Sequence, residues 1–466
     1  MTKLTRGIIV IAVGLVIWFA PLPAGLKPQA LHLFAIFTAV IIGFILQPIP
    51  TGAVALVGLS LAAATGVLKL GEVLSGFSNG TIWLIVSAFL FAKGFIKTGL
   101  GRRISYRIMQ AIGDSTLKMG YAFVLSDIIM APATPSSTAR VGGVLFPIAR
   151  SLSSAFGSEP GPTSRRIGSY LILLLYEIDA IACAMFLTAM AGNPLIALLA
   201  KETLHIEISW GLWASAAIVP GVLSLLLIPY VLYKIYPPEV TKTPEAKELA
   251  SQELAKMGPM SRAEKIMCAV FIGALTLWIT AQYNRMDATV VALLGVSFML
   301  LTNVIEWKDV TSESGAWDTM IWMGTLVALA GNLSKVGFIP WFAKAVSSSI
   351  TGIAWLPAFL ILLLVYVYSH YAFASLTAHI TAMYAAFCAV AVAAGAPSYL
   401  VALALAFMSN LCMPLTHYGG GPAPLLFGAG YVDQATWWKL GFVFTGLNLA
   451  VWVGLGGIWW KVLGLW

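Results

Sequence analysis

Charged residues are scarce in this chain: Asp, Glu, Lys and Arg make up only 10% of its 466 residues, whereas hydrophobic residues make up 59%. A water-soluble domain carries about 25% charged residues, so this chain cannot cover itself with a soluble surface. Soluble enzymes, nucleic-acid-binding proteins and disordered proteins are therefore excluded. The composition instead predicts an all-α integral membrane protein surrounded by the lipid bilayer.

Cysteine is also scarce, and its four residues lie in apolar stretches without a CxxC pair. This spacing argues against a disulfide framework. Neither an HExxH sequence nor a Cys/His cluster along the chain supports a metal centre, so we expect no metal, no cofactor and no membrane enzyme. The cysteines are interpreted as small buried hydrophobic side chains: Cys183, Cys268, Cys388 and Cys412.

Long apolar runs are abundant. A spanning helix needs about 20 mostly apolar residues, and about eleven transmembrane helices are predicted on that basis. Two further apolar stretches, 119–155 and 352–394, are each interrupted near the middle by small polar residues. They are predicted to be re-entrant hairpins that enter and leave on the same side. The predicted spans lie near 7–25, 29–48, 51–68, 80–97, 167–188, 209–235, 266–283, 288–305, 317–335, 398–415 and 439–461.

Lysine and arginine residues predict the orientation. With the N-terminus in the cytoplasm, eighteen of them fall inside and six outside, as the positive-inside rule requires. This bias also explains the net charge of +8 without an anionic partner. Pro21-Leu22-Pro23 follows the first span where a cleavage site would be expected, so that span is predicted to be retained. The outside set is Lys27, Lys69, Lys201, Arg285, Lys335 and Lys344.

A single long polar stretch, 237–265, lies at the midpoint of the chain. Its mixed charges and its Glu, Lys and Ala content predict a cytoplasmic linker with some helix. It separates an N-terminal half, 1–236, from a C-terminal half, 266–466. Because no transit peptide precedes the first span, we expect a multi-pass protein of a bacterial inner (cell) membrane with a cytoplasmic N-terminus.

The two halves carry matching motifs in the same order, at offsets of 238, 239 and 228 residues. The central pair reads Ser-x-Thr-Ala followed by a cationic residue in both copies. The two predicted hairpins have their bases on opposite sides of the membrane, so the repeats are predicted to be inverted. Inverted repeats with broken helices are typical of secondary transporters. The matching pairs are 97–99 with 335–337, 135–140 with 374–379, and 187–194 with 415–422.

The hairpin tips are the predicted substrate site. Non-helical backbone at membrane depth occurs only where it is buried in protein or lines a wet cavity. Hydroxyl groups and free N–H groups at helix starts bind carboxylates well, so each tip could hold one carboxylate of a dicarboxylate. The alternative is that these Ser and Thr residues only pack between helices. The candidates from the tips and from the two interrupted helices are Ser136, Ser137, Thr138, Asn193, Pro194, Ser375, Thr377, Thr416, Gly421 and Pro422.

Arg140 and His379 follow the two tips at the same position. A charge near mid-membrane costs roughly 2.5–3.5 kcal/mol, so such residues usually serve a function. We expect both side chains to supply positive charge to a bound dianion. The alternative for Arg140 is a structural pair with Asp127, Glu177 or Asp179, and for His379 a neutral ring hydrogen-bonded within its helix.

Other polar residues within apolar segments leave alternatives open. Glu177 and Asp179 could carry protons, but could equally pair with Arg140 or with arginines of the neighbouring loop. His370 and His417 could bind protons or a metal. These residues do not decide between coupled and uncoupled transport.

The chain resembles the divalent anion:sodium symporter (DASS, or INDY) family, most closely the antiporter branch with the bacterial citrate–succinate antiporter and the plastid 2-oxoglutarate/malate translocators. The likeness runs along nearly the whole chain. It is clearest in five motifs: 99–103 (GLGRR), 134–140 (TPSSTAR), 165–168 (RRIG), 373–379 (FASLTAH) and 428–432 (GAGYV).

The resemblance implies a homodimer in which each protomer has a fixed scaffold and a mobile transport domain that moves as an elevator. Sodium symporters of this family carry Ser-Asn-Thr at both tips. Ser137 and Leu376 stand at the two Asn positions here, and a Leu side chain offers no oxygen to a hard cation. The resemblance therefore implies that Leu376 lies in the site and that sodium coupling is lost.

These features predict an obligate antiporter of di- and tricarboxylates, of the 2-oxoglutarate, malate, succinate and citrate class, that works without sodium. An empty site with unpaired positive charge would cross the membrane poorly, whereas a loaded site would be closer to neutral. The alternatives are a sodium- or proton-coupled symporter, an anion channel and, least favoured, a membrane enzyme.

Overall fold

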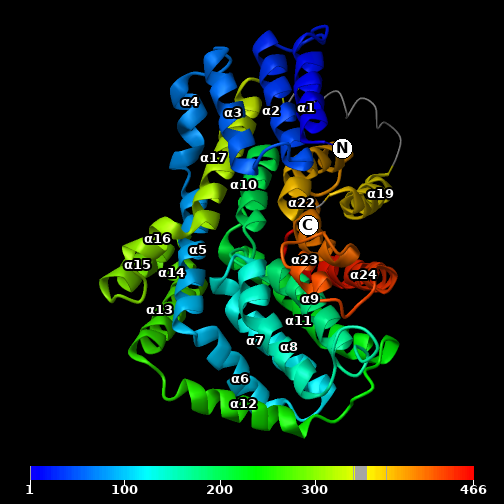
Figure 1. Ribbon diagram of the computed structural model, residues 1–466. Coiled ribbons are helices and arrows are strands. Elements are labelled where there is room, and N and C mark those ends of the chain that lie inside the picture. The colour runs from blue at the N-terminus through cyan, green and yellow to red at the C-terminus, as the bar shows by residue number, and fades with distance from the viewer. Residues whose placement is uncertain (1, 339–340, 342–353, 374) are drawn as a thin grey trace.

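The computed structural model describes residues 2–338, 341, 354–373 and 375–466, and the described part is helical without a β-strand. The predicted all-α class is confirmed. Figure 1 shows an elongated molecule built from helices, with different helices at its two ends. Residues 352–353 at the start of the second predicted hairpin, Lys344 and Ala374 lie outside the described residues.

Eight helical segments of the described residues are long and apolar enough to cross a membrane, in agreement with a multi-pass membrane protein. Six of them coincide with predicted spans, and two, Trp355–Ala372 and Leu376–Ala393, are the arms of the second predicted hairpin. The predicted total of eleven crossings and the re-entrant path of this hairpin remain predictions. The six are Pro28–Leu46, Gly80–Thr98, Gly168–Met185, Trp210–Ile235, Ser398–Leu415 and Gln434–Val462.

The described residues of the N-terminal half contain eleven α-helices, and an additional helix, α12 (Pro244–Met257), forms about half of the linker. Their starts follow local rules: Asn79 and Ser209 cap α5 and α11 with side-chain oxygens, and Pro28 begins α2, where a missing N–H is harmless. The helices are α1 (Lys3–Trp18), α2 (Pro28–Leu46), α3 (Thr51–Ala64), α4 (Leu70–Leu74), α5 (Gly80–Thr98), α6 (Leu100–Ile112), α7 (Thr116–Met130), α8 (Phe146–Ala155), α9 (Gly168–Met185), α10 (Gly192–Leu204) and α11 (Trp210–Ile235).

The first helix of the C-terminal half, α13, already begins within the predicted linker, at a capping box in which Ser261 and Glu264 satisfy each other's backbone N–H groups. Asp287 and Asp433 cap two later helices. The described helices are α13 (Arg262–Ile279), α14 (Ala281–Asn284), α15 (Ala288–Leu301), α16 (Trp307–Ser312), α17 (Ser314–Lys335), α19 (Trp355–Tyr368), α20 (Leu376–His379), α21 (Ala385–Ala393), α22 (Ser398–Leu411), α23 (Ala423–Gly428), α24 (Gln434–Leu449) and α25 (Gly456–Val462).

The two predicted hairpins share one detail of backbone structure. In each, a short 3₁₀ turn ends the first arm, and a π-helical stretch lies within the first residues of the second arm: η3 (Thr138–Leu145) and η5 (Ile380–Tyr384). Single π-turns inside helices occur frequently at functional sites. The break that the sequence predicts near the middle of each hairpin is therefore real, and both breaks have similar geometry.

The core of the molecule is built on α9 and α22. Every residue of α9 is buried, and all but the first two residues of α22 are buried as well. These helices precede the two interrupted segments that the sequence places in the site. A helix that is buried on all sides must satisfy its polar side chains within the protein, so the polar residues of α9 and α22 need partners there.

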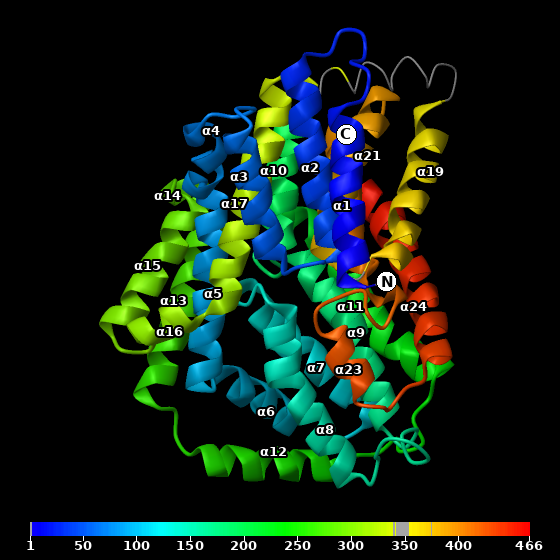
Figure 2. The same cartoon turned by 45° about the horizontal axis from the view of Figure 1, so that its top comes forward.

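The linker helix α12 lies across one end of the molecule beside α6, at the end opposite α4 (Figures 1 and 2). Arg103 of α6 donates from Nε to Glu264 at the start of α13, over 2.6 Å, in a pair whose side chains are 7% and 4% exposed. The backbone N–H of Thr116, at the base of the first hairpin, donates to the carbonyl of Thr241. The linker thus contacts both the first hairpin and α6.

Candidate functional site

The first hairpin tip, residues 134–138, connects η2 (Ala131–Ala133) with the π-helical stretch η3. The hydroxyl oxygen of Ser136 accepts from the backbone N–H of Ala139 over 3.2 Å, which fixes the start of the second arm in the manner of an N-cap. Ser136 is half-buried, Ser137 is 8% exposed, and Thr138 is exposed. The tip therefore presents the Thr138 hydroxyl at an accessible surface.

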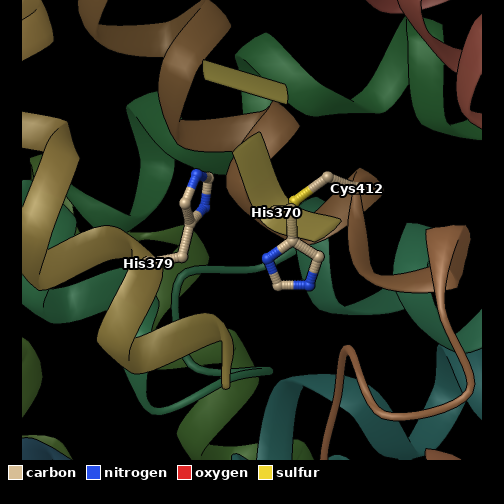
Figure 3. A group of neighbouring side chains, drawn as sticks. All are labelled: His370, His379 and Cys412. Atoms are coloured by element: carbon tan, nitrogen blue, oxygen red, sulfur yellow. The ribbon is translucent and has the colours of Figure 1, made fainter. Parts of the chain in front are cut away.

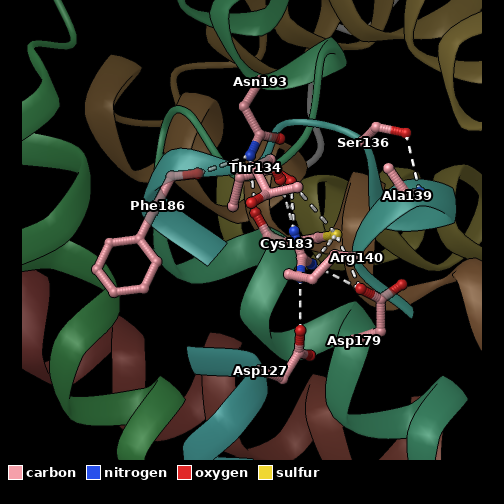
Figure 4. Close-up of polar contacts among 10 residues, drawn as sticks. Asp127, Thr134, Ser136, Ala139, Arg140, Asp179, Cys183, Phe186 and Asn193 are labelled. Atoms are coloured by element: carbon pink, nitrogen blue, oxygen red, sulfur yellow. Dashed lines mark hydrogen bonds and ion pairs between the residues drawn. The ribbon is translucent and has the colours of Figure 1, made fainter. Parts of the chain in front are cut away.

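Arg140 is fully buried just behind this tip (Figure 4). Its Nε donates to Asp127 of α7, and one terminal nitrogen donates to Asp179 of α9 over 2.6 Å and to the sulfur of Cys183. The other terminal nitrogen donates to the carbonyl oxygens of Thr134 and Ala189, over 2.7 and 3.2 Å. A guanidinium has five N–H donors, and these five partners account for all of them.

The structure therefore shows the structural pair that was the alternative for Arg140. The expectation of an unpaired cation in the empty site is wrong, because two carboxylates flank the guanidinium and no N–H is left for a substrate. Through Thr134 and Ala189, Arg140 links the first tip to the interrupted segment that follows α9. Buried ionic networks of this kind hold geometry well and tolerate the loss of one member poorly.

The second tip lies between η4 (Ser369–Ala372) and α20. The Ser375 hydroxyl caps the second arm by accepting from the N–H of Ala378, over 3.4 Å. Ser375 and Thr377 are half-buried, and Leu376 is 6% exposed. The Leu376 side chain is thus buried at the tip, and it provides no oxygen ligand for a cation.

His379 is completely buried behind the second tip. Its Nε2 lies 2.9 Å from the carbonyl oxygen of Tyr366 and 3.1 Å from the hydroxyl of Ser369, both on the first arm or its end. The ring packs against the rings of Tyr366 and Phe373, with centroids 4.4 and 5.0 Å apart. A carbonyl only accepts, so Nε2 carries the hydrogen, and His379 makes the contacts of a neutral ring held within its hairpin.

The interrupted segment of each half lies against the hairpin of the other half. A Cβ atom added at Gly421 would lie 2.3 Å from the hydroxyl oxygen of Thr138 and 3.8 Å from that of Ser137. A Cβ added at Gly192 would lie 2.7 Å from Cδ1 of Ile380 in the second hairpin. The absence of a side chain at both glycines is what permits these approaches. Each hairpin therefore contacts the interrupted segment of the other half.

Asn193 and Asn410 join the halves in the core. The amide nitrogen of Asn193 donates to the carbonyls of Cys183 and Phe186, and its oxygen accepts from Asn410 of α22 over 2.9 Å. Both polar groups of Asn193 are thus used inside the protein. Within the predicted site, Asn193 therefore links α10 to α9 and α22.

The remaining predicted residues lie around the two interrupted segments. Pro194 is buried in the first turn of α10, and Pro422 is buried at the N-cap of α23. Thr416 is completely buried, and its hydroxyl oxygen has no hydrogen-bond partner among the described residues. Gly421, in contrast, is exposed beside Thr138.

The structure brings Ser137, Thr138 and Gly421 together, whereas no hydrogen bond between described residues joins the first tip to the second. Ser375 instead lines a cavity of about 370 Å³ with Phe373, Ala378 and residues of α1, α2 and the turn after α2. One of those residues is Arg6, whose guanidinium donates to the carbonyl of Leu46. The two tips therefore have different surroundings in this conformation.

Sequence reasoning missed two features of the site. The first is the tie between Asn193 and Asn410, because an Asn in an apolar helix resembles an ordinary packing residue. The second is the packing of His370, His379 and Cys412, whose wide sequence separation conceals that they are neighbours. Only the depth of these polar residues within apolar stretches could have drawn attention to them.

A model of the sodium:sulfate symporter transmembrane region matches residues 1–466 of the chain. The putative malate transporter YflS of Bacillus subtilis is 53% identical to it, covering 100% of this chain and 97% of that protein. Chloroplastic dicarboxylate transporter 1 of Arabidopsis thaliana is 48% identical, covering 98% and 82%. The inner membrane protein YbhI of Escherichia coli is 41% identical, covering 100% and 98%.

Among solved structures, the YdaH transporter of Alcanivorax borkumensis is similar, with a TM-score of 0.55 over 99% of this chain and 97% of that chain. The two sequences are only 11% identical. At this level of identity the likeness concerns the fold alone.

Proposed function

The chain belongs to the divalent anion:sodium symporter (DASS) family, and from this premise we propose that it exchanges dicarboxylates across its membrane without sodium. It is a membrane transporter rather than an enzyme. The malate and dicarboxylate transport attributed to its relatives supports the substrate class. As substrates we propose the dicarboxylates 2-oxoglutarate, malate and succinate and the tricarboxylate citrate.

The observation that carries the proposal is the approach of Gly421 to Ser137 and Thr138. The buried Ser137 and the exposed Thr138, at the start of η3, lie together with the exposed backbone at Gly421. A carboxylate accepts hydrogen bonds from such groups, and the positive end of the helix dipole favours its charge. The second carboxylate would be held by Ser375 and Thr377 once the two tips close around the substrate.

Arg140 and His379 are positioning residues in this proposal. Each sits on the second arm of its hairpin and bonds back to the first arm, so each fixes the backbone of its tip. The substrate would then contact the hydroxyl and N–H groups of the tips. Arg140 and His379 would hold those groups in place without contacting the substrate.

In this proposal, transport requires a bound substrate because the polar groups of the tips need hydrogen-bond partners, and not because the empty site holds an unpaired charge. When the site crosses the membrane it must leave water, and each buried donor without a partner costs about 1–3 kcal/mol. A bound dicarboxylate supplies those partners, whereas the empty site has none. Leu376 stands where a cation site would need an oxygen, so sodium cannot substitute for the substrate.

We propose that crossing occurs by an elevator movement in a homodimer. Figure 2 shows α13–α16 on one side of the molecule and α19 and α24 on the other, an arrangement in keeping with a separate scaffold and transport domain. The linker with α12, which joins α11 to α13, lies at the end that the positive residues place in the cytoplasm.

The test uses purified protein in liposomes and follows labelled succinate or 2-oxoglutarate. Internal dicarboxylate and an inward sodium gradient are varied independently. The proposal requires uptake that depends on internal dicarboxylate and is unchanged by sodium. Uptake into vesicles without internal dicarboxylate, driven by sodium, contradicts it.

Substitution of Thr138 by Val tests the site itself. A hydrogen bond to a charged group contributes about 1.5–3 kcal/mol, so the substitution should lower kcat/KM for exchange about ten- to hundredfold. Ser151→Ala, at an exposed serine of α8 on the same hairpin, is the matched control and should leave exchange unchanged. Equal activity of both variants would remove Thr138 from the site.

Glu177 supports a second candidate function, proton-coupled symport. It is a buried carboxyl on α9, and its Oε2 has no hydrogen-bond partner among the described residues. A group in that position could carry a proton with the substrate. Uptake driven by an inward proton gradient into vesicles without internal dicarboxylate, and abolished by Glu177→Gln, would favour this candidate over exchange.

A further inference from the structure

His370, His379 and Cys412 form a buried cluster beneath the second tip (Figure 3). One ligand atom from each residue lies within 4.8 Å of the other two. All three residues are 0% exposed. They come from three different segments: η4 at the end of the first arm, α20 at the start of the second arm, and the residue that follows α22.

The hydrogen bonds fix the tautomer of both histidines. Nε2 of His370 lies 2.9 Å from the carbonyl oxygen of Gly419, and Nε2 of His379 lies 2.9 Å from that of Tyr366. A carbonyl oxygen only accepts, so each Nε2 carries the hydrogen and each Nδ1 presents a lone pair. Neither Nδ1 has a hydrogen-bond partner among the described residues.

Two buried acceptors without donors, side by side and next to a thiol, need an explanation. A buried polar group without a hydrogen-bond partner destabilises the folded state. Figure 3 shows the Nδ1 edges of the two rings on the sides that face each other. Metal-binding histidines characteristically donate the other ring N–H to a backbone carbonyl or carboxylate, which is the arrangement of both rings here.

We propose that this cluster binds one thiophilic d¹⁰ cation, Zn²⁺ or Cu⁺, through Nδ1 of His370, Nδ1 of His379 and the thiolate of Cys412. Thiolate and imidazole are the ligands these ions prefer. Metal–ligand bonds of about 2.0–2.3 Å at tetrahedral angles put ligand atoms about 3.3–3.6 Å apart. The three ligand atoms, which lie within 4.8 Å of one another, would therefore have to approach by up to about 1.5 Å. Binding releases the thiol proton, and the thiolate neutralises one positive charge of the ion.

A bound ion would connect both arms of the second hairpin to the segment that leads into Gly421. Three elements that must rearrange around a substrate would then be held in one geometry. A Zn²⁺ ion, unlike Cu⁺, would also leave one net positive charge beneath the second tip. Binding of the ion does not depend on the proposed transport activity, and it can be measured on protein in detergent.

The experiment uses the full-length purified protein, reduced and freed of metal with a chelator. Co²⁺ serves as a spectroscopic probe for the Zn²⁺ site, and Zn²⁺ and, under anaerobic conditions, Cu⁺ are titrated in competition with chromophoric chelators. We expect one equivalent of Zn²⁺ or Cu⁺ per chain and, for a site that accepts Zn²⁺, a thiolate-to-cobalt charge-transfer band. Preference for Zn²⁺ or for Cu⁺ identifies the ion, and both results support the site.

Cys412→Ser should abolish the cobalt band and weaken binding at least tenfold, and His370→Gln should weaken it by a similar factor. Cys388→Ser is the matched control, since Cys388 is a buried cysteine of α21 on the same hairpin, and it should bind as the wild type does. Cys412→Ala provides the same test if the Ser variant fails to fold. The absence of stoichiometric binding by wild-type protein, or binding unchanged by Cys412→Ser and His370→Gln together, would overturn the proposal.

Discussion

The two hairpins use one position in two chemically different ways. In the first, Arg140 bonds back to Asp127, and in the second His379 bonds back to Tyr366; both partners are thirteen residues earlier. The first bond joins a buried ionic network that includes Asp179 of α9. The second is a neutral contact with a backbone carbonyl, supported by aromatic rings.

The two hairpins thus share a structural feature, a side chain that joins their two arms, but they do not share the charge of that side chain. In both hairpins a side chain from the second arm ties it to the first arm just behind the tip. The ionic version needs its partners, because a lone charge is costly in the interior. The neutral version loses only an ordinary hydrogen bond when it is removed. The hairpins should therefore respond very differently to equivalent substitutions.

The largest expected effect follows from Arg140→Met. It leaves Asp127 and Asp179 buried without their cation, which should lower the free energy of unfolding by about 3–5 kcal/mol. Arg140→Lys keeps the charge but loses the planar set of donors, so it should also be strongly destabilised. His379→Met, the equivalent change in the second hairpin, should lower it by only about 1 kcal/mol.

Thermal unfolding of the three variants in detergent measures this contrast. One result would contradict this contrast between the two hairpins. If Arg140→Lys is as stable as the wild type and only raises KM for the dicarboxylate, then Arg140 acts directly through its charge.

A second prediction concerns the linker, which contacts the base of the first hairpin. Glu264→Gln leaves Arg103 buried without its charged partner, so stability should fall by about 3 kcal/mol. Glu253→Gln on α12 removes the half-buried partner of the exposed Lys256 and should change stability by under about 0.5 kcal/mol. Thermal unfolding of both variants at neutral pH makes the measurement, and equal effects would contradict a role for the buried pair.

The same ion pair predicts a pH dependence. Burial raises the pKa of Glu264, but hydrogen bonds from Arg103 and Ser261 outweigh it and hold the pKa below its ordinary value of 4.5. A lowered pKa means that the pair stabilises the protein above pH 4.5 and that this contribution is lost as the pH falls through the folded-state pKa. Glu264→Gln should therefore flatten the acid limb of the stability curve relative to the wild type.

The two glycine approaches give a third, smaller effect. Gly421→Ala places a Cβ against the exposed Thr138 hydroxyl, so it should lower kcat/KM for exchange about tenfold with little loss of stability. Gly192→Ala places a Cβ against buried Ile380 and should instead destabilise the fold by about 1–3 kcal/mol. Gly428→Ala meets no atom within 4 Å and serves as the control.

Liposome exchange and thermal unfolding, applied to all three glycine variants, separate the two effects. Should Gly421→Ala exchange normally, the first tip and the second interrupted segment would not form the substrate site.

The smallest effect is expected from Tyr366→Phe. The substitution removes the hydroxyl that lies 2.6 Å from the Ser409 hydroxyl, but it keeps the carbonyl that His379 uses. Stability should fall by about 1 kcal/mol, whereas Asp127→Asn at the equivalent position of the first hairpin should cost several times more. Comparable losses in thermal unfolding would show that the two hairpins are held in similar ways.

The sequence predicted the helical class, the two interrupted hairpins and the residues at their tips, because these depend on local rules. Apolar run length predicts a span, and clustered Ser, Thr, Gly and Pro residues predict a break. It could not predict the state of Arg140, since Asp127 and Asp179 were two candidate partners among several. Nor could it predict that Gly421 lies against the opposite hairpin, because that contact depends on how the halves pack.

The sequence alone was enough to show that this chain spans a membrane, that its halves carry matching motifs and that polar breaks lie within apolar segments. Composition and periodicity are enough for such conclusions, because water and lipid act on each segment separately. Only the tertiary structure decided which buried polar groups are satisfied and which are not. Arg140 has every donor paired, whereas Nδ1 of His370 and His379 has no partner among the described residues. Partners in a buried network come from distant segments, so their presence becomes known only when those segments are packed together.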